Sequence, residues 1–390
     1  MRFSGFTDEW SEHKFENIFD IKNGLNKGKD YFGEGIRILN YMDVNKYELN
    51  TENTIKGLVE LTDDEIERYS VKPNDLFFTR TSETSEEIGL TSAYMGNTIK
   101  CVFSGFLLRA RPKIDLNSLF FAYYLRSPRQ RNNIIKFSSI TTRALISGGN
   151  LSKMKIKYPS IEEQNKIANL FLILDKKVEL LERKYREYQC FKKYLMQKLF
   201  AQELRFDFND TWKTVKIKDI FDERSEKGFL DLELLSVTLN DGVIKRSEIE
   251  SKDNSNENKS NYKHVLPGDI VYNSMRMWQG ASGVSPYEGI VSPAYTILIP
   301  KNVYSKYFGY YFKTNEMVYQ FKKYSQGLTS DTWNLKYPLI SEIKIKIPSI
   351  EEQKEITIIF EIMDEKIKIL QNNIDELTTF KKGLLQQMFV

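Results

Sequence analysis

Side chains that commonly bind metals or form disulfides are scarce in this chain of 390 residues. It contains two cysteines, Cys101 and Cys190, and two histidines, His13 and His264. A zinc site needs a cluster of such ligands, and a disulfide framework needs several paired cysteines. We therefore expect neither a metal site nor a disulfide framework.

Side chains that can read DNA bases are concentrated beyond the ends of two expected strands. Arginine pairs with guanine, Asn and Gln pair with adenine, and apolar groups contact the thymine methyl. In the second half of the chain such groups follow the strand expected from Asp269. The candidate readers there are Asn273, Met275, Arg276, Trp278 and Gln279. Burial of the tryptophan in the core is the alternative interpretation.

The corresponding segment of the first half offers Arg80 as a base reader and the hydroxyls of Thr79, Thr81 and Ser82 as phosphate contacts. The alternative is that Arg80 is simply an exposed charge. Further candidates lie later in each half and are Thr142, Arg143, Thr329 and Ser330.

The distribution of charge also favours a nucleic-acid partner. The net charge of +4 permits such a partner without requiring one. Between Leu116 and Ile161, however, the chain has no acidic residue. A solvated basic face is the alternative, but so long a stretch without acids favours a polyanion. Its basic residues are Arg126, Arg129, Arg131, Lys136, Arg143, Lys153, Lys155 and Lys157.

The sequence contains an internal repeat, which organises the whole chain. Residues 157–164 (KYPSIEEQ) recur as residues 346–353 (KIPSIEEQ), and the match continues to the C-terminus. The preceding parts match more weakly, in the same order. Each half is therefore a divergent domain followed by a closely repeated tail. Matching pairs are Trp10 and Trp212, Asp75 and Asp269, Asp175 and Asp364, Phe191 and Phe380, and Phe200 and Phe389.

Both tails are expected to be long helices. Ser160 with Glu163, and Ser349 with Glu352, have the spacing of a capping box. Apolar residues then recur in alternating steps of four and three, which predicts a coiled-coil seam. The seam takes an extra step of three to Phe191 and Phe380 in the two tails. We expect the helices to pack antiparallel and to bring Val390 near Met1.

The expected fold class is α+β, with a pseudo-two-fold repeat. Two mixed α/β domains, residues 1–158 and 203–347, are joined by two long antiparallel coiled-coil helices. The expected bounds of the helices are residues 159–202 and 348–390.

This duplicated order resembles the specificity subunits of type I restriction-modification systems over the whole chain. Trp10 and Trp212 look like the openings of that family's domains. Pro-Asn-Asp75 and Pro-Gly-Asp269 look like its strand signature. The run around Arg276 is similar to one found in some specificity subunits, which strengthens its candidacy.

The resemblance implies two target-recognition domains, each reading half of a bipartite double-stranded DNA site. It also implies two modification subunits that methylate adenine and restriction subunits that join them. S-adenosylmethionine, ATP and Mg²⁺ would bind those partners, and this chain would have no catalytic residue. We expect partner docking on exposed helix positions. Candidates, for which capping is the alternative role, are Glu162, Glu163, Gln164, Glu351, Glu352 and Gln353.

Two other functions are weighed against this interpretation. A stand-alone DNA methyltransferase or nuclease is disfavoured, because no Asn-Pro-Pro-Tyr-type motif occurs and the Glu342-Ile-Lys344 triplet lacks a preceding Pro-Asp. A non-DNA adaptor built on a coiled coil is the second alternative. The sequence has no signal peptide or long apolar run, which predicts a soluble cytoplasmic protein.

Overall fold

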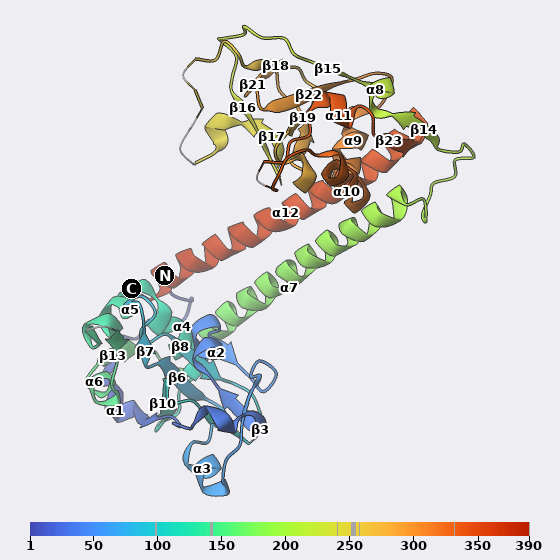
Figure 1. The fold of residues 1–390 in the computed structure, drawn as a ribbon. Coiled ribbons are helices and arrows are strands. Elements are labelled where there is room, and N and C mark those ends of the chain that lie inside the picture. The colour runs from blue at the N-terminus through green and yellow to red at the C-terminus, as the bar shows by residue number, and fades with distance from the viewer. Residues whose placement is uncertain are drawn as a thin grey trace. The chain divides into compact units, whose positions relative to one another are not determined.

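The structure is a computed structural model that describes residues 1–97, 100–140, 143–239, 241–250, 255–256, 258–330 and 332–389. It divides into two compact units (Figure 1). Unit 1 comprises Met1–Glu182 with Asn372–Val390, and unit 2 comprises Arg183–Gln371. Each unit therefore combines one globular domain with parts of both long helices. These helices are α7 (Ile161–Phe200) and α12 (Ile350–Met388).

Unit 1 is built on a five-stranded sheet with the order β2-β10-β6-β8-β4. All five residues of the central strand β6 (Asp75–Thr79) are buried, as expected for an apolar run covered on both faces. It pairs antiparallel with β10 (Leu107–Pro112) and β8 (Thr91–Tyr94). The buried helix α4 (Ser118–Arg126) packs against β6 and β8. The outer strands are β2 (Phe19–Asn23) and β4 (Leu49–Asn50).

Shorter elements surround this sheet. Two three-stranded sheets have the orders β5-β3-β9 and β11-β12-β7, and β1 pairs with β13. These strands are β1 (Ser11–Lys14), β3 (Phe32–Leu39), β5 (Gly57–Val59), β7 (Thr81–Ser82), β9 (Cys101–Phe103), β11 (Ser139–Ile140), β12 (Ala144–Leu145) and β13 (Lys155–Tyr158). The short helices are α1 (Phe15–Ile18), η1 (Lys29–Tyr31), α2 (Tyr41–Lys46), α3 (Asp63–Arg68), α5 (Pro128–Lys136) and α6 (Gly148–Ser152).

Unit 2 has a four-stranded sheet with the order β15-β22-β19-β20. Its central strand β19 (Ile270–Asn273) pairs antiparallel with β22 (Tyr295–Pro300) and β20 (Ser282–Val284). The other strands are β14 (Lys213–Lys216), β15 (Phe221–Glu223), β16 (Leu235–Thr238), β17 (Gly242–Lys245), β18 (Lys263–Val265), β21 (Gly289–Val291) and β23 (Lys344–Ile347). The helices are α8 (Ile217–Ile220), η2 (Arg246–Glu248), η3 (Met277–Gln279), α9 (Ser305–Tyr311), α10 (Asn315–Tyr324) and α11 (Tyr337–Ile340).

The internal repeat is visible in how each domain closes. In unit 1 the first strand, β1, pairs with β13, which directly precedes α7. In unit 2 the corresponding strand, β14, pairs with β23, which directly precedes α12. Each long helix therefore begins where the two ends of its own domain meet.

The last residues of each long helix pack into the core of the domain from which the other long helix starts. Phe389, just beyond α12, packs against Phe171 of α7 and Tyr124 of α4 in unit 1. Phe200, the last residue of α7, packs in the same way against Phe360 and Tyr311 in unit 2. Both phenylalanines are buried, and burial of such a side chain contributes about 1.5–3 kcal/mol. Each long helix thus contributes its terminal phenylalanine to the core at the start of the other helix, an arrangement we call reciprocal closure.

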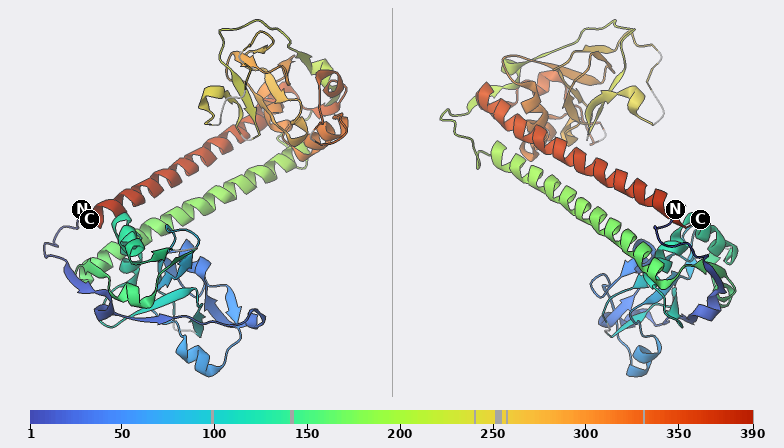
Figure 2. Two further views of the ribbon diagram at one scale, coloured as in Figure 1. Left: turned by 60° about the vertical axis from the view of Figure 1, so that its left-hand side comes forward. Right: turned by 180° about the vertical axis from the view of Figure 1, so that it is seen from behind.

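Within both units the helix segments run antiparallel, as the sequence predicts. The start of α7 lies beside the end of α12 in unit 1, and the end of α7 lies beside the start of α12 in unit 2. In unit 1 the N-terminal amine donates to the carbonyl oxygen of Gln387 at 2.6 Å, so the chain start lies beside the end of α12 (Figures 1 and 2). Val390 itself lies outside the described residues.

One expected feature of the helix seam is wrong. Phe191 and Phe380 do not extend the seam, because both side chains are more than half exposed. The next residues point inward instead: Lys381 pairs with Asp175 in unit 1, and Lys192 pairs with Asp364 in unit 2. The spacing of apolar residues cannot predict this arrangement, because the side chain that points to the other helix is a lysine and its exposed neighbour is a phenylalanine.

Candidate DNA interface

In both units the central strand starts from the same turn. A left-handed residue, Asn74 (φ 68°) or Gly268 (φ 92°), precedes a buried aspartate, Asp75 or Asp269. Gly and Asn adopt this conformation at the lowest cost, and the preceding proline suits the turn. The duplicated Pro-Asn-Asp and Pro-Gly-Asp triplets therefore fix where β6 and β19 begin.

The buried aspartates anchor these strands by ion pairs. Asp75 accepts from Nε and Nη2 of Arg111, both at 2.7 Å. Asp269 accepts from Nε of Arg224 at 2.8 Å. Hydrogen bonds between charged groups are stronger than neutral ones, so the strand starts are firmly held. The candidate reading residues follow the opposite ends of the same strands.

In unit 1 the structure places the hairpin that carries Arg143 beside the candidate segment of residues 79–82. The hairpin β11–β12 pairs with β7, with Ala144 opposite Ser82. The amide of Ile146 donates to the carbonyl oxygen of Arg80 at 3.0 Å. The exposed Arg143 therefore lies beside residues 80–82, with its guanidinium 3.7 Å from Glu83. Thr142 lies outside the described residues.

The hydroxyl candidates of unit 1 need correction. Thr79 is buried, and its hydroxyl donates to the carbonyl oxygen of Glu87 at 2.8 Å and accepts from the amide of Leu90 at 2.9 Å. Ser82 is also buried and accepts from the amide of Thr84. Both hydroxyls shape the turn and are not accessible to phosphate. Thr81 remains partly exposed.

Arg80 is only partly accessible. Its Nη1 donates to the carbonyl oxygen of Gly105 through a long 3.4 Å contact. Its Nε is buried and has no hydrogen-bond partner among the described residues. The guanidinium is therefore loosely held and retains donors for a ligand.

In unit 2 the reading segment forms a compact turn after β19. The carboxamide oxygen of Asn273 accepts from the amide of Met275 at 3.0 Å, which shapes the turn. Met275, Arg276 and Gln279 are exposed. Trp278 is neither a core residue nor fully free, because its Nε1 donates to the carbonyl oxygen of Met275 at 3.1 Å.

A second segment of unit 2 packs beside this turn. The ring of Trp333 lies edge-on to Trp278, with centroids 5.3 Å apart. The amide of Leu335 donates to the carbonyl oxygen of Ser274 at 2.9 Å. The exposed Thr329 and Ser330 lie in the loop that leads to Trp333.

Sequence reasoning missed two residues of this surface. Trp333 and Lys322 were not singled out, although the Lys322 ammonium lies 5.5 Å from the Trp333 ring centroid. Leu328, in the same loop, is 100% exposed. The sequence did hold a signal for Trp333. The loop between α10 and Leu335 occupies the same place in the repeat as the hairpin that carries Arg143.

The basic stretch of unit 1 divides into structural and exposed residues. Arg126 donates to the carbonyl oxygen of Thr91 at 2.8 Å, and Arg131 donates to that of Gly89 at 2.9 Å. Burial lowers the pKa of Arg126, and lowers the pKa of Arg131 to about 10. These two arginines tie loops to helices, so they do not contribute to a polyanion surface.

The Glu-Glu-Gln repeats are mostly structural. Glu163 accepts from Nε of Arg2 at 2.9 Å, and Glu352 accepts from Nε of Arg205 at 2.9 Å. Both carboxylates are buried and bind an arginine, and the amide of Glu352 also donates to the Ser349 hydroxyl at 3.4 Å, which is one half of the expected capping box.

The following glutamines are buried as well. Gln164 accepts from the amide of Asn117, and Gln353 accepts from that of Tyr304, each at 2.9 Å. These residues fasten each helix to its own domain. Only Glu162 and Glu351 of the six docking candidates are exposed.

Within the described ranges, no group of three or more His, Cys, Asp or Glu residues is placed to hold a metal ion. No helix of these ranges has the length and apolarity to span a membrane.

Comparison with known proteins gives a family assignment. Residues 7–187 and 209–379 match the type I restriction modification DNA specificity domain. The chain therefore belongs to this family and is the non-catalytic DNA-specificity subunit of a type I restriction-modification complex, in which it assembles with other subunits.

Several relatives are similar over most of the chain. The MjaX type I restriction enzyme specificity subunit of Methanocaldococcus jannaschii is 22% identical, covering 97% of this chain and 92% of that protein. The EcoKI specificity subunit of Escherichia coli is 24% identical over 56% of this chain and 47% of that protein. The crystal structure of the S subunit from M. genitalium has a TM-score of 0.60 at 16% identity, covering 100% of this chain and 98% of the other.

Proposed function

We propose that this subunit reads a bipartite double-stranded DNA site, with one half-site assigned to each domain. The target-recognition domains are residues 1–158 and 203–347. The helices of residues 159–202 and 348–390 connect them and carry the partner subunits. The readers are the strand-end turn and the following hairpin or loop in each domain.

The single observation that carries this proposal is a shared backbone with different side chains. In unit 1 the bond from Ile146 to the Arg80 carbonyl joins the two reading segments, and in unit 2 the bond from Leu335 to the Ser274 carbonyl does the same. The side chains on these frames differ, with Arg143 beside residues 80–82 in one and Trp278 beside Trp333 in the other. Base-edge contacts specify sequence, so different side chains on one frame support two different half-sites.

The partners we propose are two modification subunits, which dock on the long helices, and restriction subunits that join the complex. Exposed apolar residues recur at equivalent helix positions in both units and offer two like surfaces to two copies of one protein. In unit 1 they are Ile173, Leu180 and Phe380, and in unit 2 they are Ile362, Ile369 and Phe191. Glu162 and Glu351 are the remaining charged candidates for this surface.

The chemistry of the complex is assigned to the partners. The modification subunits would bind S-adenosylmethionine and flip the target adenine out of the duplex. The restriction subunits would bind ATP and Mg²⁺. This chain would then act in the cytoplasm, where those partners meet chromosomal DNA.

The test is methylome sequencing of a host that expresses this chain with its modification subunit. A bipartite motif with one methylated adenine on each strand is expected. A contiguous motif, or none with an active modification subunit, would contradict the proposal. Methylation by this chain alone would support a stand-alone enzyme, and failure of the complex to bind duplex DNA would support the adaptor alternative.

A further inference from the structure

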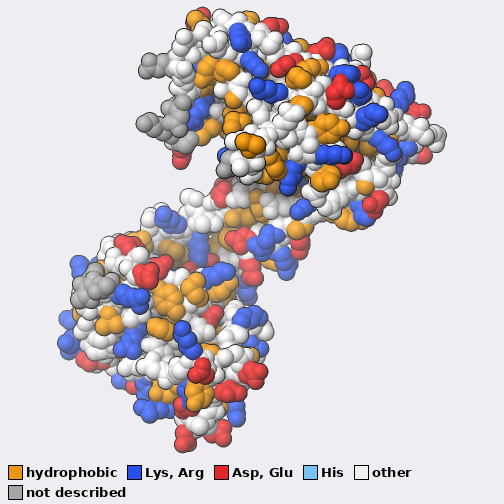
Figure 3. Space-filling view, viewed as in Figure 1, with side chains coloured by type: hydrophobic (Ala, Val, Ile, Leu, Met, Phe, Trp, Pro, Cys, Tyr) orange, Lys and Arg blue, Asp and Glu red, His pale blue; other side chains and the backbone are white. Residues whose placement is uncertain are grey.

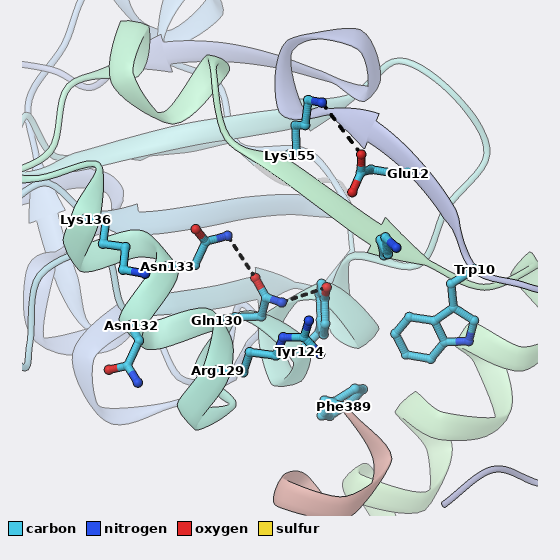
Figure 4. Close-up of a pocket in the computed structure, with 11 residues that line it drawn as sticks. Trp10, Glu12, Tyr124, Arg129, Gln130, Asn132, Asn133, Lys136, Lys155 and Phe389 are labelled. Atoms are coloured by element: carbon cyan, nitrogen blue, oxygen red, sulfur yellow. Dashed lines mark hydrogen bonds and ion pairs between the residues drawn. The ribbon is translucent and has the colours of Figure 1, made fainter.

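A basic cavity of about 530 Å³ opens on unit 1, away from the residues that sequence reasoning identified as readers (Figure 4). It lies between α5, the paired strands β1 and β13, and the end of α12. Its cationic side chains are Arg129, Lys136, Lys155 and Lys157, and its single acid is Glu12.

The floor of the cavity is an ordered polar network. Gln130 is buried, and its Nε2 donates to the Tyr124 hydroxyl at 2.8 Å. Its Oε1 accepts from Nδ2 of Asn133 at 3.4 Å (Figure 4). Burial raises the pKa of Tyr124 to about 12, so the phenol stays neutral at physiological pH. Buried, hydrogen-bonded side chains therefore form the floor of the cavity, which is more than a gap between surface lysines.

The charges of the cavity are poorly neutralised by the protein. Lys155 lies 3.7 Å from Glu12, a long ion pair between exposed groups. Within the part of the chain that the structure describes, Arg129, Lys136 and Lys157 have no ion-pair partner. Four cations facing one acid favour an anionic ligand. The side-chain amide of Asn133, beside these cations, can donate a further hydrogen bond to the oxygens of an anionic ligand.

We propose that this cavity binds a backbone phosphate of the DNA that flanks the half-site read by unit 1. This inference rests on the proposed function. Lys, Arg and Asn side chains are frequent phosphate contacts, and such contacts set the register of a protein on the duplex. Helix α5 ends at Lys136 and leads to β11, which begins at Ser139. One helix thus connects the cavity with the hairpin that carries Arg143.

The internal repeat favours DNA over an acidic partner protein as the ligand. Helix α10 occupies the place of α5 in unit 2, and its buried residues Met317 and Phe321 match Gln130 and Ile134. In this register Arg129 is replaced by Glu316, whereas Lys136, Lys155 and Lys157 recur as Lys323, Lys344 and Lys346. A modification subunit that docks in two copies would need the same charge in both units. The charge reversal at Arg129 therefore fits DNA that flanks one half-site better than a partner protein that binds both halves alike.

The test measures DNA affinity of the complex with its modification subunit at several salt concentrations. Arg129→Glu should weaken binding to all sequences alike and reduce the slope of log affinity against log salt by about one per lost phosphate contact. Lys157→Gln should have the same direction of effect. Lys100→Glu is the matched control, because Lys100 is exposed and lies 3.8 Å from Asp63 of α3. Acidic side chains gather at that tip of unit 1 (Figure 3), so the salt slope should not change.

Each other outcome overturns the proposal. An unchanged salt slope for both cavity variants would show that no phosphate binds there. Weaker binding of the modification subunit with an unchanged slope would assign the cavity to an acidic partner segment. If the wild-type complex shows no sequence-specific DNA binding, the proposed function itself fails. If the wild-type complex binds specifically but the cavity variants bind with the wild-type salt slope, only the cavity proposal fails.

Discussion

The helix ends and the reading segments are both duplicated in this chain, but they differ in what the duplication preserves. At the helix ends the side chains themselves recur, since Tyr123 donates to Asp175 at 2.6 Å and Tyr310 donates to Asp364 at 2.8 Å. In the reading segments only the backbone connection recurs. Under the proposed function, the difference separates what both halves must share from what must differ between two half-sites.

The shared part is a reciprocal closure of the two cores. Each helix starts at its own domain through the buried Glu and Gln pair and ends in the core of the other unit through a phenylalanine. Either domain can therefore change its reading segments without disturbing the helices, provided that it keeps these contacts. Four predictions break or sharpen this comparison, in order of decreasing effect.

The largest effect is expected from the helix-end phenylalanines. Phe389→Ala removes a buried aromatic ring from unit 1 and should lower the free energy of unfolding by about 3–5 kcal/mol. Hydrogen exchange should show the loss of protection first in unit 1. Phe200→Ala should act in the same way on unit 2. Phe380→Ala is the control, because that ring is 56% exposed and its removal should have little effect. Equal effects of Phe389→Ala on both units would contradict reciprocal closure.

The next effect concerns the buried carboxylates. Glu352→Ala removes the carboxylate that accepts from Arg205 and from the Trp212 indole and should destabilise the protein by about 1–3 kcal/mol. Chemical denaturation measures it. Glu351→Ala, on the exposed neighbour, is the control and should leave stability unchanged. If Glu351→Ala instead weakens binding of the modification subunit, the docking role of that position is supported.

Within the reading segments, Arg276 should carry the clearest specificity effect. If Arg276 pairs with guanine, Arg276→Ala should cost about 1–3 kcal/mol of binding and relax one position of the second half-site. Arg276→Lys should restore part of the affinity without the specificity, since Lys lacks the planar fork of Arg. Equal weakening on every sequence would instead identify a phosphate contact.

The smallest effect is expected from Lys322, which lies over the Trp333 ring. Lys322→Ala removes an exposed cation–π contact, which is worth about 0.5–1 kcal/mol, and should loosen the loop of residues 326–334. Affinity for the second half-site should fall slightly, while the first half-site is unaffected. An equal change at both half-sites would mean that Lys322 acts through general electrostatics.

Much of the architecture could be predicted because its signals are periodic or repeated. The heptad spacing and the repeated KYPSIEEQ and KIPSIEEQ segments predict two long helices, and the structure places them as α7 and α12. Periodicity failed at Phe191 and Phe380, where the side chain turned inward is a lysine paired with an aspartate. Such a partly exposed ion pair leaves no hydrophobic signal in the sequence.

The candidate site was harder to predict because residue type does not reveal exposure. Thr79 and Thr81 are similar in sequence context, but Thr79 ends the fully buried strand β6, whereas Thr81 begins the short strand β7 and is partly exposed. Arg126 and Arg129 are three residues apart in an acid-free stretch, and only Arg129 points to the cavity. Trp333 was missed because its partner, Trp278, is distant in the sequence.

The most direct test of the central claim is a domain exchange. Residues 1–158 are replaced by the equivalent domain of another specificity subunit that retains aromatic residues at positions 120 and 124, so that Phe389 keeps its core. The methylated motif is then sequenced in a host that also expresses the modification subunit. We predict that one half of the motif changes and the other half stays the same. A change in both halves, or in neither, would contradict two independent readers.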